Sequence, residues 1–207
     1  MIDVVIAVVM GYLLGSIPVG LLVGRKAQGV DVRDYGSGKT GFTNSLRVLG
    51  MKRSLPVFVG DFGKGALAAL LSLLYTDDPW ARALGGLAAI VGHVWPVFAG
   101  FRGGRGVLPG LGALAALNPL ALAIVVPVAG LTLMATKYMS ATSIVGCTTG
   151  AIVFVAFAAT GIHPWALAVA AVLGSSLIVL LHHDNIRRLM AGTEPKVGRG
   201  GQRRATA

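Results

Sequence analysis

The chain has 207 residues, of which 55% are hydrophobic and only 13% are charged, and its mean hydropathy is +0.76. About a quarter of the residues of a typical soluble domain are charged, so this composition indicates a protein of the lipid bilayer and excludes an ordinary soluble domain. The net charge is +10, but the cations are spaced between apolar segments. That distribution excludes a nucleic-acid-binding module.

The chain is predicted to be an all-α polytopic membrane protein with seven transmembrane helices. The apolar segments are, in chain order, 2–24, 55–76, 80–99, 107–117, 120–136, 142–160 and 165–182. Pro18 is expected to kink the first of them, and the fourth is short for a full crossing. Asp61 and Lys64 interrupt the second segment three residues apart, so they can pair with each other or face one polar cavity. Because the start of the chain, Met1-Ile2-Asp3, has no basic region, the first segment is predicted to be a retained span.

The distribution of cations predicts the orientation of the bundle. If successive spans alternate in direction, only Arg82 of the 18 Lys and Arg residues lies clearly on the face opposite to the others. The positive-inside rule makes the cation-rich face cytoplasmic. We therefore expect the N-terminus outside, the C-terminus in the cytoplasm and all the unusual polar loops on the cytoplasmic face. Residues 1–198 are expected to form a single integral-membrane domain, and residues 199–207 a basic, disordered tail.

The longest polar interval contains the island Gly36-Ser37-Gly38-Lys39-Thr40-Gly41-Phe42-Thr43-Asn44-Ser45-Leu46-Arg47. Its glycines let backbone amides approach an anion, and a helix beginning after the loop would add its positive dipole end. The first six residues fit the pattern G-x-G-x-x-G, but no strand precedes them, so a dinucleotide site is rejected. The island is either an anion-binding loop or a tight turn between helices with solvated hydroxyl groups.

Three further polar stretches border the spans. Residues 101–106 are rich in glycine and arginine, and they can bind phosphate bidentately or lie against anionic lipid headgroups. Ser140 and Ser143 lie three residues apart, as do His182 and Asn185, so each pair would share one face of a helix. His93, next to Val94-Trp95, fits a polar contact within the bundle or packing at the interface. The few carboxylates and the histidine spacing predict no metal site.

Taken together, these segments resemble the bacterial acyl-phosphate:glycerol-3-phosphate acyltransferase family (PlsY) over most of the chain. The resemblance rests on Gly15-Ser16-Ile17-Pro18-Val19-Gly20, Gly36-Ser37-Gly38, Gly41, Thr43-Asn44, Arg47, Asp61, Lys64-Gly65, Gly92-His93, Trp95-Pro96-Val97-Phe98, Phe101, Gly103-Gly104-Arg105-Gly106-Val107, Lys137-Tyr138, Ser140, Ser143, His182, Asn185-Ile186, Arg188-Leu189, Gly192-Thr193-Glu194 and Lys196. A single one of these motifs is weak, but the ordered set is specific.

The resemblance implies an enzyme of the bacterial inner membrane that faces the cytoplasm. It implies transfer of a fatty acyl group from acyl phosphate to the 1-hydroxyl of sn-glycerol 3-phosphate, giving lysophosphatidic acid and phosphate in phospholipid biosynthesis. No cofactor is implied, and neither acyl-CoA nor acyl carrier protein is the implied donor. The implied partners are the two substrates and the bilayer, with an upstream enzyme that produces acyl phosphate. The base that removes the hydroxyl proton is either His182 or a substrate phosphate.

The resemblance also implies the residues of the site. Ser37, Arg47 and Arg105 would hold phosphate, and His182 and Asn185 would bind glycerol 3-phosphate. The remaining implied substrate-binding residues are Gly36, Gly38, Thr43, Asn44, Gly103, Gly104, Lys137, Ser140, Ser143 and Arg188.

Several positions depart from the family pattern. Lys39 stands where asparagine is usual, and Phe42 replaces a small residue. Arg102 and Arg105 stand where lysines are typical, and Leu108-Pro109 replaces a small residue and a hydroxyl residue. Two other functions fit parts of the sequence. One is a small transporter of anions or organophosphates, although its polar groups would lie nearer the midplane of the bilayer. The other is a non-catalytic protein that binds anionic lipids through its basic loops.

Overall fold

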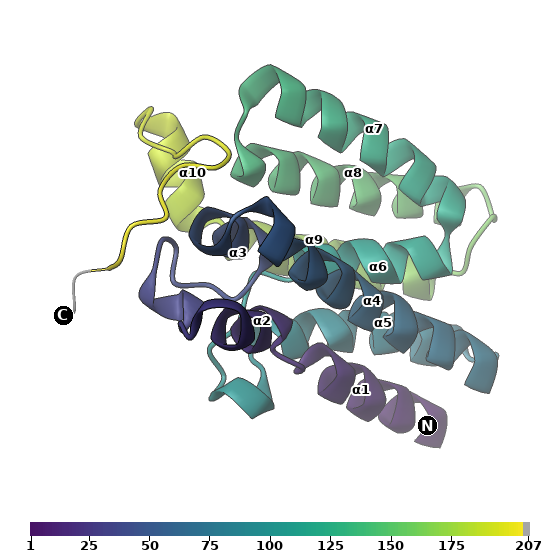
Figure 1. Ribbon diagram of the computed structural model, residues 1–207. Coiled ribbons are helices and arrows are strands. Elements are labelled where there is room, and N and C mark those ends of the chain that lie inside the picture. The colour runs from purple at the N-terminus through teal and green to yellow at the C-terminus, as the bar shows by residue number, and fades with distance from the viewer. Residues whose placement is uncertain (205–207) are drawn as a thin grey trace.

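The computed structural model describes residues 1–204 of the chain. In that part, ten α-helices and two 3₁₀ turns are connected by short loops (Figure 1). The elements are α1 (Ile2–Gly15), α2 (Val19–Gln28), η1 (Val32–Asp34), α3 (Phe42–Leu49), α4 (Met51–Tyr75), α5 (Pro79–Val94), η2 (Val97–Ala99), α6 (Val107–Leu117), α7 (Pro119–Thr136), α8 (Met139–Ala159), α9 (Trp165–Leu180) and α10 (His183–Met190). The predicted all-α architecture is confirmed.

Several of these elements are long and apolar enough to cross a membrane. Within residues 1–204 there are five such segments: Ile2–Gln28, Met51–Tyr75, Pro79–Ala99, Pro119–Thr136 and Met139–Ala159. Helices α9 and α10 would form a sixth span if they are taken as one segment, bent by 56°. Helix α6 has 11 residues, which is a length of about 16 Å, whereas the hydrocarbon core of a bilayer is about 30 Å thick.

The long helices pack closely because small residues line their contacts, as is common in membranes. A methyl group on Gly11 of α1 would lie 2.2 Å from the carbonyl oxygen of Gly85 in α5. Likewise, a methyl group on Gly65 of α4 would lie 2.0 Å from the carbonyl oxygen of Pro109 in α6. These backbones touch directly, so α6 is held against α4 on one side of the bundle.

The break in the first apolar segment is stabilised by a buried lysine. Helix α1 ends at Gly15 and α2 begins at Val19, as expected from the proline between them. The ammonium group of Lys64 donates a hydrogen bond of 2.9 Å to the carbonyl of Ile17, which also accepts the backbone N–H of Val19 at 3.0 Å. Lys64 also forms the predicted pair with Asp61, at 2.9 Å. The imidazole of His93 lies 3.4 Å from the same carboxylate, so the predicted polar contact of His93 within the bundle is confirmed.

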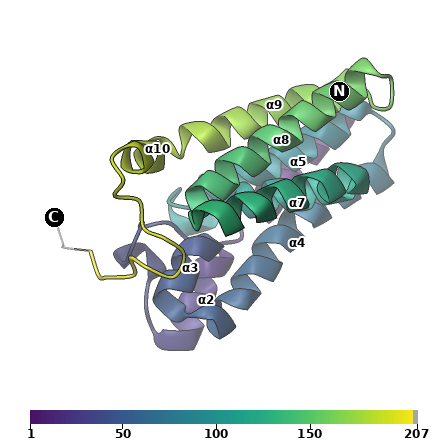
Figure 2. The ribbon, with the colours of Figure 1, turned by 90° about the horizontal axis from the view of Figure 1, so that it is seen from above.

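The polar loops collect at one end of the bundle. Helices α2, α3 and α10 and the turn between α7 and α8 lie there, and the chain's N-terminus lies at the other end (Figures 1 and 2). The far end carries its own polar contacts: Tyr75 donates a hydrogen bond of 2.7 Å to Asp3, and Arg82 lies 2.6 Å from Asp77. The fold therefore brings together loops that are about 140 residues apart in sequence, as with Arg47 and Arg188, the charges of which interact.

Candidate active site

The side chain of Asn44 organises the first polar loop. Its amide nitrogen donates hydrogen bonds to the carbonyl oxygens of Val32 (2.8 Å), Tyr35 (3.2 Å) and Lys39 (2.9 Å). Its amide oxygen accepts a hydrogen bond of 2.9 Å from the backbone N–H of Ser37. Asn44 is buried, and all its hydrogen-bonding groups are used by the loop. We predicted that Asn44 binds substrate; in this arrangement it contributes through the shape of the loop.

Glycines at two positions allow this loop to fold tightly. Gly36 has φ of +53° and Gly38 has φ of +70°, values in the left-handed region that favours glycine. A methyl group on Gly36 would also lie 2.3 Å from the amide oxygen of Asn44. Helix α3 begins at Phe42 with Gly41 as its N-cap, so the positive end of its dipole lies at the end of the loop, as the sequence suggested.

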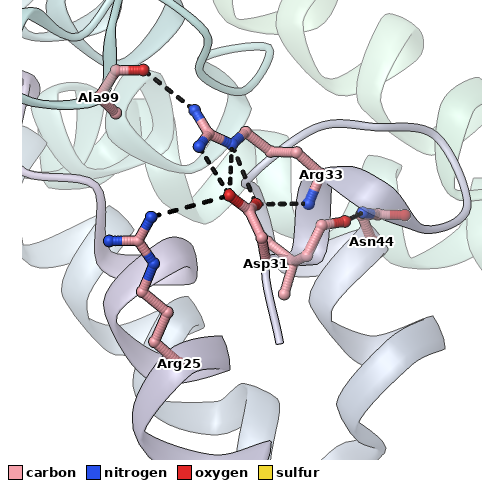
Figure 3. A network of polar contacts seen from close by, with 6 residues as sticks. Arg25, Asp31, Arg33, Asn44 and Ala99 are labelled. Carbon is pink, nitrogen blue, oxygen red and sulfur yellow. Dashed lines mark hydrogen bonds and ion pairs between the residues drawn. The ribbon is translucent and has the colours of Figure 1, made fainter. Parts of the chain in front are cut away.

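An ion pair ties the first loop to the segment that precedes the second (Figure 3). The guanidinium group of Arg33 lies 2.7 Å from the carboxylate of Asp31, and its other nitrogen donates a hydrogen bond of 3.0 Å to the carbonyl of Ala99. The hydrogen bond from Arg33 holds the pKa of Asp31 below its ordinary value. Arg25 is more distant, at 3.9 Å, and exposed, so its contribution to stability is small.

The second loop rests on the end of α5. Gly103 and Gly104 donate backbone hydrogen bonds to the carbonyls of Val94 (3.2 Å) and His93 (3.0 Å). Thr40 of the first loop donates one to Gly103, at 3.4 Å. A methyl group on Gly104 would lie 2.0 Å from Nε2 of His93, so a residue with a side chain would displace the loop.

A buried carboxylate lies at the centre of the site. Glu194 accepts a hydrogen bond of 2.6 Å from the amide of Asn185 and lies 2.7 Å from Nε of Arg188. Burial raises the pKa of Glu194, but the hydrogen bonds from Asn185 and Arg188 help to hold it below its ordinary value overall. Glu194 is therefore ionised and holds the segment after α10 against that helix.

Three arginines surround this single carboxylate. The charges of Arg47 and Arg105 both interact with those of Glu194 and Arg188. Burial and the charge of Arg188 lower the pKa of Arg105 to about 10, so its guanidinium stays protonated near neutral pH. Nε of Arg105 donates a hydrogen bond of 3.1 Å to the carbonyl of Leu181. The cluster has three positive charges against one negative charge, which suits an anionic ligand.

His182 lies in the turn between α9 and α10, next to the arginines. Its Nδ1 lies 2.7 Å from the carbonyl of Ile178. A carbonyl only accepts hydrogen bonds, so Nδ1 carries the proton and Nε2 of the neutral ring has a free lone pair. Burial, followed by the charge of Arg105, lowers the pKa of His182 to about 4. The ring is therefore neutral near pH 7 and can accept a hydrogen bond from a hydroxyl group.

An apolar cavity of about 440 Å³ runs from the site into the bundle between α5, α6, α7, α8 and α9. Ser143 and Ile178 line the end near the site, and Leu117, Phe154 and Leu167 line the far end. Because the carbonyl of Ile178 holds His182, this end of the cavity lies close to the imidazole. Cys147 also lines the cavity, among apolar neighbours.

The structure brings most of the predicted site residues to one end of the bundle. His182, Asn185, Arg47, Arg105, Arg188 and Ser140 converge around Glu194. The hydroxyl of Ser143 is bonded to the carbonyl of Met139 at 2.8 Å, Lys137 ends α7 with φ of +61°, and Thr43 lies in the first turn of α3. Nε of Arg47 and Oδ1 of Asn185 are buried without a hydrogen-bond partner among residues 1–204, as expected of groups that meet a ligand.

Four groups near the site were not among the predicted site residues. Glu194 accepts a hydrogen bond from Asn185. Asp31 and Arg33 pair with each other, and Arg33 also binds the carbonyl of Ala99. His93 lies against Gly104, and Arg204 reaches the first loop from the C-terminal segment. The spacing of Glu194 from Asn185 and Arg188 carried a weak signal for Glu194, because a lone acid among basic residues suggests a partner.

Comparison with known proteins agrees with this geometry. The profile of the family "Glycerol-3-phosphate acyltransferase" matches residues 5–192. A glycerol-3-phosphate acyltransferase of Synechococcus sp. (strain CC9902) is 42% identical over 93% of this chain and 94% of its own length. One of Geobacillus kaustophilus (strain HTA426) is also 42% identical, over 94% and 96%. The crystal structure of PlsY, an integral membrane glycerol 3-phosphate acyltransferase in its glycerol 3-phosphate form, matches with a TM-score of 0.85 and 35% identity over 93% of this chain and 94% of that one.

Proposed function

The chain belongs to the glycerol-3-phosphate acyltransferase family, and on that premise we propose that it transfers an acyl group from acyl phosphate to the 1-hydroxyl of sn-glycerol 3-phosphate. The products are lysophosphatidic acid and phosphate. The observation that carries the proposal is the cluster of Arg47, Arg105 and Arg188 around one carboxylate, together with an apolar cavity that ends near it at Ser143 and Ile178. Both substrates carry phosphate, and only the donor carries a long apolar chain.

We further propose seven membrane passes, with the N-terminus outside and the polar end of the bundle in the cytoplasm. The fourth pass is α6, which lies alongside α4 (Figure 1). A short helix is acceptable there because α6 is packed against α4 and borders the interior cavity, so protein surrounds its ends. The cytoplasmic assignment rests on the positive-inside rule, and in a bacterium this membrane is the inner one. A water-soluble acceptor and an acyl phosphate made by an upstream enzyme would both reach this face.

The proposed binding mode divides the substrates between the polar cluster and the cavity. The acyl chain lies in the cavity, and the phosphate group of the donor extends from the end of the cavity toward Arg105 and Arg47. Glycerol 3-phosphate binds between the first loop and α10, near Ser37 and Asn185. Positioning and charge neutralisation then account for most of the rate, because an acyl phosphate is already activated. The free amide oxygen of Asn185 and Nε of Arg47 are buried groups that these ligands would satisfy.

The proposed chemical step is attack of the 1-hydroxyl oxygen on the acyl carbonyl carbon. The new ester C–O bond forms, the bond from the carbonyl carbon to the phosphate oxygen breaks, and phosphate leaves. Nε2 of His182 accepts the hydrogen bond of the attacking hydroxyl. Because the environment disfavours a charged imidazole, a substrate phosphate is the better final acceptor of the proton. His182 then orients the hydroxyl, and the donor phosphate takes the proton as it leaves.

The donor is tested with purified protein in lipid vesicles. Palmitoyl phosphate, palmitoyl-CoA and palmitoyl acyl carrier protein are each supplied with glycerol 3-phosphate, and lysophosphatidic acid is measured. We expect product only with the acyl phosphate. Product from either thioester would overturn the donor assignment. Uptake of glycerol 3-phosphate into sealed vesicles without acylation would instead indicate a transporter, and headgroup binding without turnover would indicate a lipid-binding protein.

A further inference from the structure

The C-terminal segment returns to the candidate active site. The family profile ends at residue 192, and the chain then continues across the polar end of the bundle. The backbone N–H of Val197 donates a hydrogen bond of 3.0 Å to the carbonyl of Lys137, at the turn between α7 and α8. We predicted disorder for residues 199–207; residues 199–204 have defined contacts in the structure, and 205–207 lie outside the described residues. Residues 197–204 form the C-terminal strap.

The strap pairs with the first polar loop as an antiparallel strand would. Two backbone hydrogen bonds make this contact: Gly36 N–H to the Gln202 carbonyl at 2.9 Å and Arg204 N–H to the Asp34 carbonyl at 2.8 Å. Together they form an isolated antiparallel bridge between Tyr35 and Arg203. Backbone pairing fixes the position of the strap along the loop, whatever its side chains are. The strap therefore has a defined register on the loop that carries Ser37.

Glycine allows the strap to lie directly on α3. A methyl group on Gly201 would be 2.3 Å from the carbonyl oxygen of Arg47, so no other residue fits at this position without moving the strap. On the other side of the loop, a methyl group on Gly38 would be 1.9 Å from Nη1 of Arg204. The guanidinium of Arg204 thus lies against the α-carbon of Gly38, which stands between Ser37 and Lys39 in the first polar loop.

The strap adds a positive charge to a region that is already positive. Lys39 is half-buried, and its pKa is lowered by burial first and then by the charges of Arg105 and Arg204. Asp184 opposes this effect, but it is one acid among three cations. Gathering like charges costs free energy unless an anion lies between them. Lys39 stands where the family pattern has asparagine. This chain therefore has an additional cation at the position where the strap meets the loop.

We propose that the backbone of the C-terminal strap supports the loop at the candidate active site, and that the side chains of Arg204 and Lys39 together bind a phosphate group of a substrate. The inference rests on the proposed acyltransferase function. The strap holds the loop of residues 36–39 in place by backbone pairing, and Arg204 supplies a guanidinium beyond those of Arg47, Arg105 and Arg188. The ligand is a phosphate monoester or an acyl phosphate, since both substrates carry the group.

The test compares two neighbouring arginines of the strap. Successive side chains of an extended segment point in opposite directions, so Arg203 carries the same charge but does not share the position of Arg204 over Gly38. Arg204→Ala should raise KM for one substrate about tenfold, the loss expected for one charge-assisted hydrogen bond. Arg203→Ala should leave KM within about twofold of the wild-type value. Measuring KM separately for glycerol 3-phosphate and for acyl phosphate identifies which phosphate is bound.

Two more variants separate a binding role from a general effect of charge. Gly201→Val keeps every charge but displaces the strap from Arg47, and it should reproduce the KM change of Arg204→Ala. Lys39→Asn combined with Arg204→Ala should raise KM by less than the product of the single effects, because both residues hold one phosphate.

Three results would overturn the inference. They are unchanged KM values in Arg204→Ala, equal changes in Arg203→Ala and Arg204→Ala, or a Gly201→Val protein with wild-type kinetics. Each of these results requires that the wild-type protein is active. If the wild-type protein releases no phosphate that depends on glycerol 3-phosphate, the proposed function fails, and that outcome is distinct from failure of the strap alone.

Discussion

Replacing Asn44 by alanine should disorder the first polar loop while the helical bundle stays folded. The substitution removes four hydrogen bonds of 2.8 to 3.2 Å. Each contributes a net of about 1 kcal/mol, and buried groups left without a partner cost more, so the total is roughly 3–5 kcal/mol of loop stability. The bundle itself depends on contacts between α1 and α5 and between α4 and α6, which lie outside this loop. The loss should therefore appear as local opening.

The assay combines kinetics with hydrogen exchange in detergent micelles. If only a small fraction of molecules keeps the loop ordered, the apparent affinity for substrate falls in proportion, so we expect KM for glycerol 3-phosphate to rise at least tenfold. Amides of residues 32–44 should exchange faster, while those of α5 stay protected. Asn118→Ala is the matched control, because Asn118 is also buried and caps α7 through Ala121 at the opposite end. A wild-type KM in Asn44→Ala, or the same rise in Asn118→Ala, would refute the reasoning.

Three further predictions follow from the site and the cavity. His182→Ala should lower kcat at saturating substrate by about tenfold; a loss of roughly 100- to 10,000-fold would instead identify His182 as the general base. Gly150→Leu should reduce activity with long acyl phosphates but not with short ones, since a methyl group there already lies 3.0 Å from Leu114 beside the cavity; an unchanged chain-length profile would place the acyl chain elsewhere. Glu194 has a pKa below its ordinary value of 4.5, so its stabilising effect is present above about pH 4.5 and is lost as pH falls through the lower value in the folded protein. The thermal unfolding temperature should therefore fall less at acid pH in Glu194→Gln than in the wild type. Equal pH profiles of this temperature in the two proteins would contradict the stabilising role of ionised Glu194.

The helical architecture could be predicted because the bilayer imposes it. Apolar runs of about 20 residues that end at charged or glycine-rich turns must be helices in lipid, and the observed α4, α7, α8 and α9 begin and end within a few residues of the expected bounds. The spacing of Asp61 and Lys64 predicted either a mutual pair or one shared polar cavity, since two charges one turn apart inside an apolar helix need polar partners. The structure shows the pair.

The internal contacts of the site could not be predicted from spacing. The sequence around Asn44 is the same whether its side chain faces a ligand or its own loop. Only the folded backbone places three carbonyls around its amide. Glu194 contacts α10 because the chain turns at Gly192, and no periodicity encodes that return. The strap was missed because residues rich in glycine and arginine have the composition of a disordered tail, whereas backbone pairing with a glycine loop depends on shape.

The most direct test of the account is the release of phosphate from acyl phosphate by the purified protein in vesicles, measured with and without glycerol 3-phosphate. The account predicts that phosphate appears only when glycerol 3-phosphate is present, in a one-to-one ratio with lysophosphatidic acid, and that Arg47→Gln sharply reduces both. Phosphate release that is independent of glycerol 3-phosphate, or no release at all from folded protein, would contradict it.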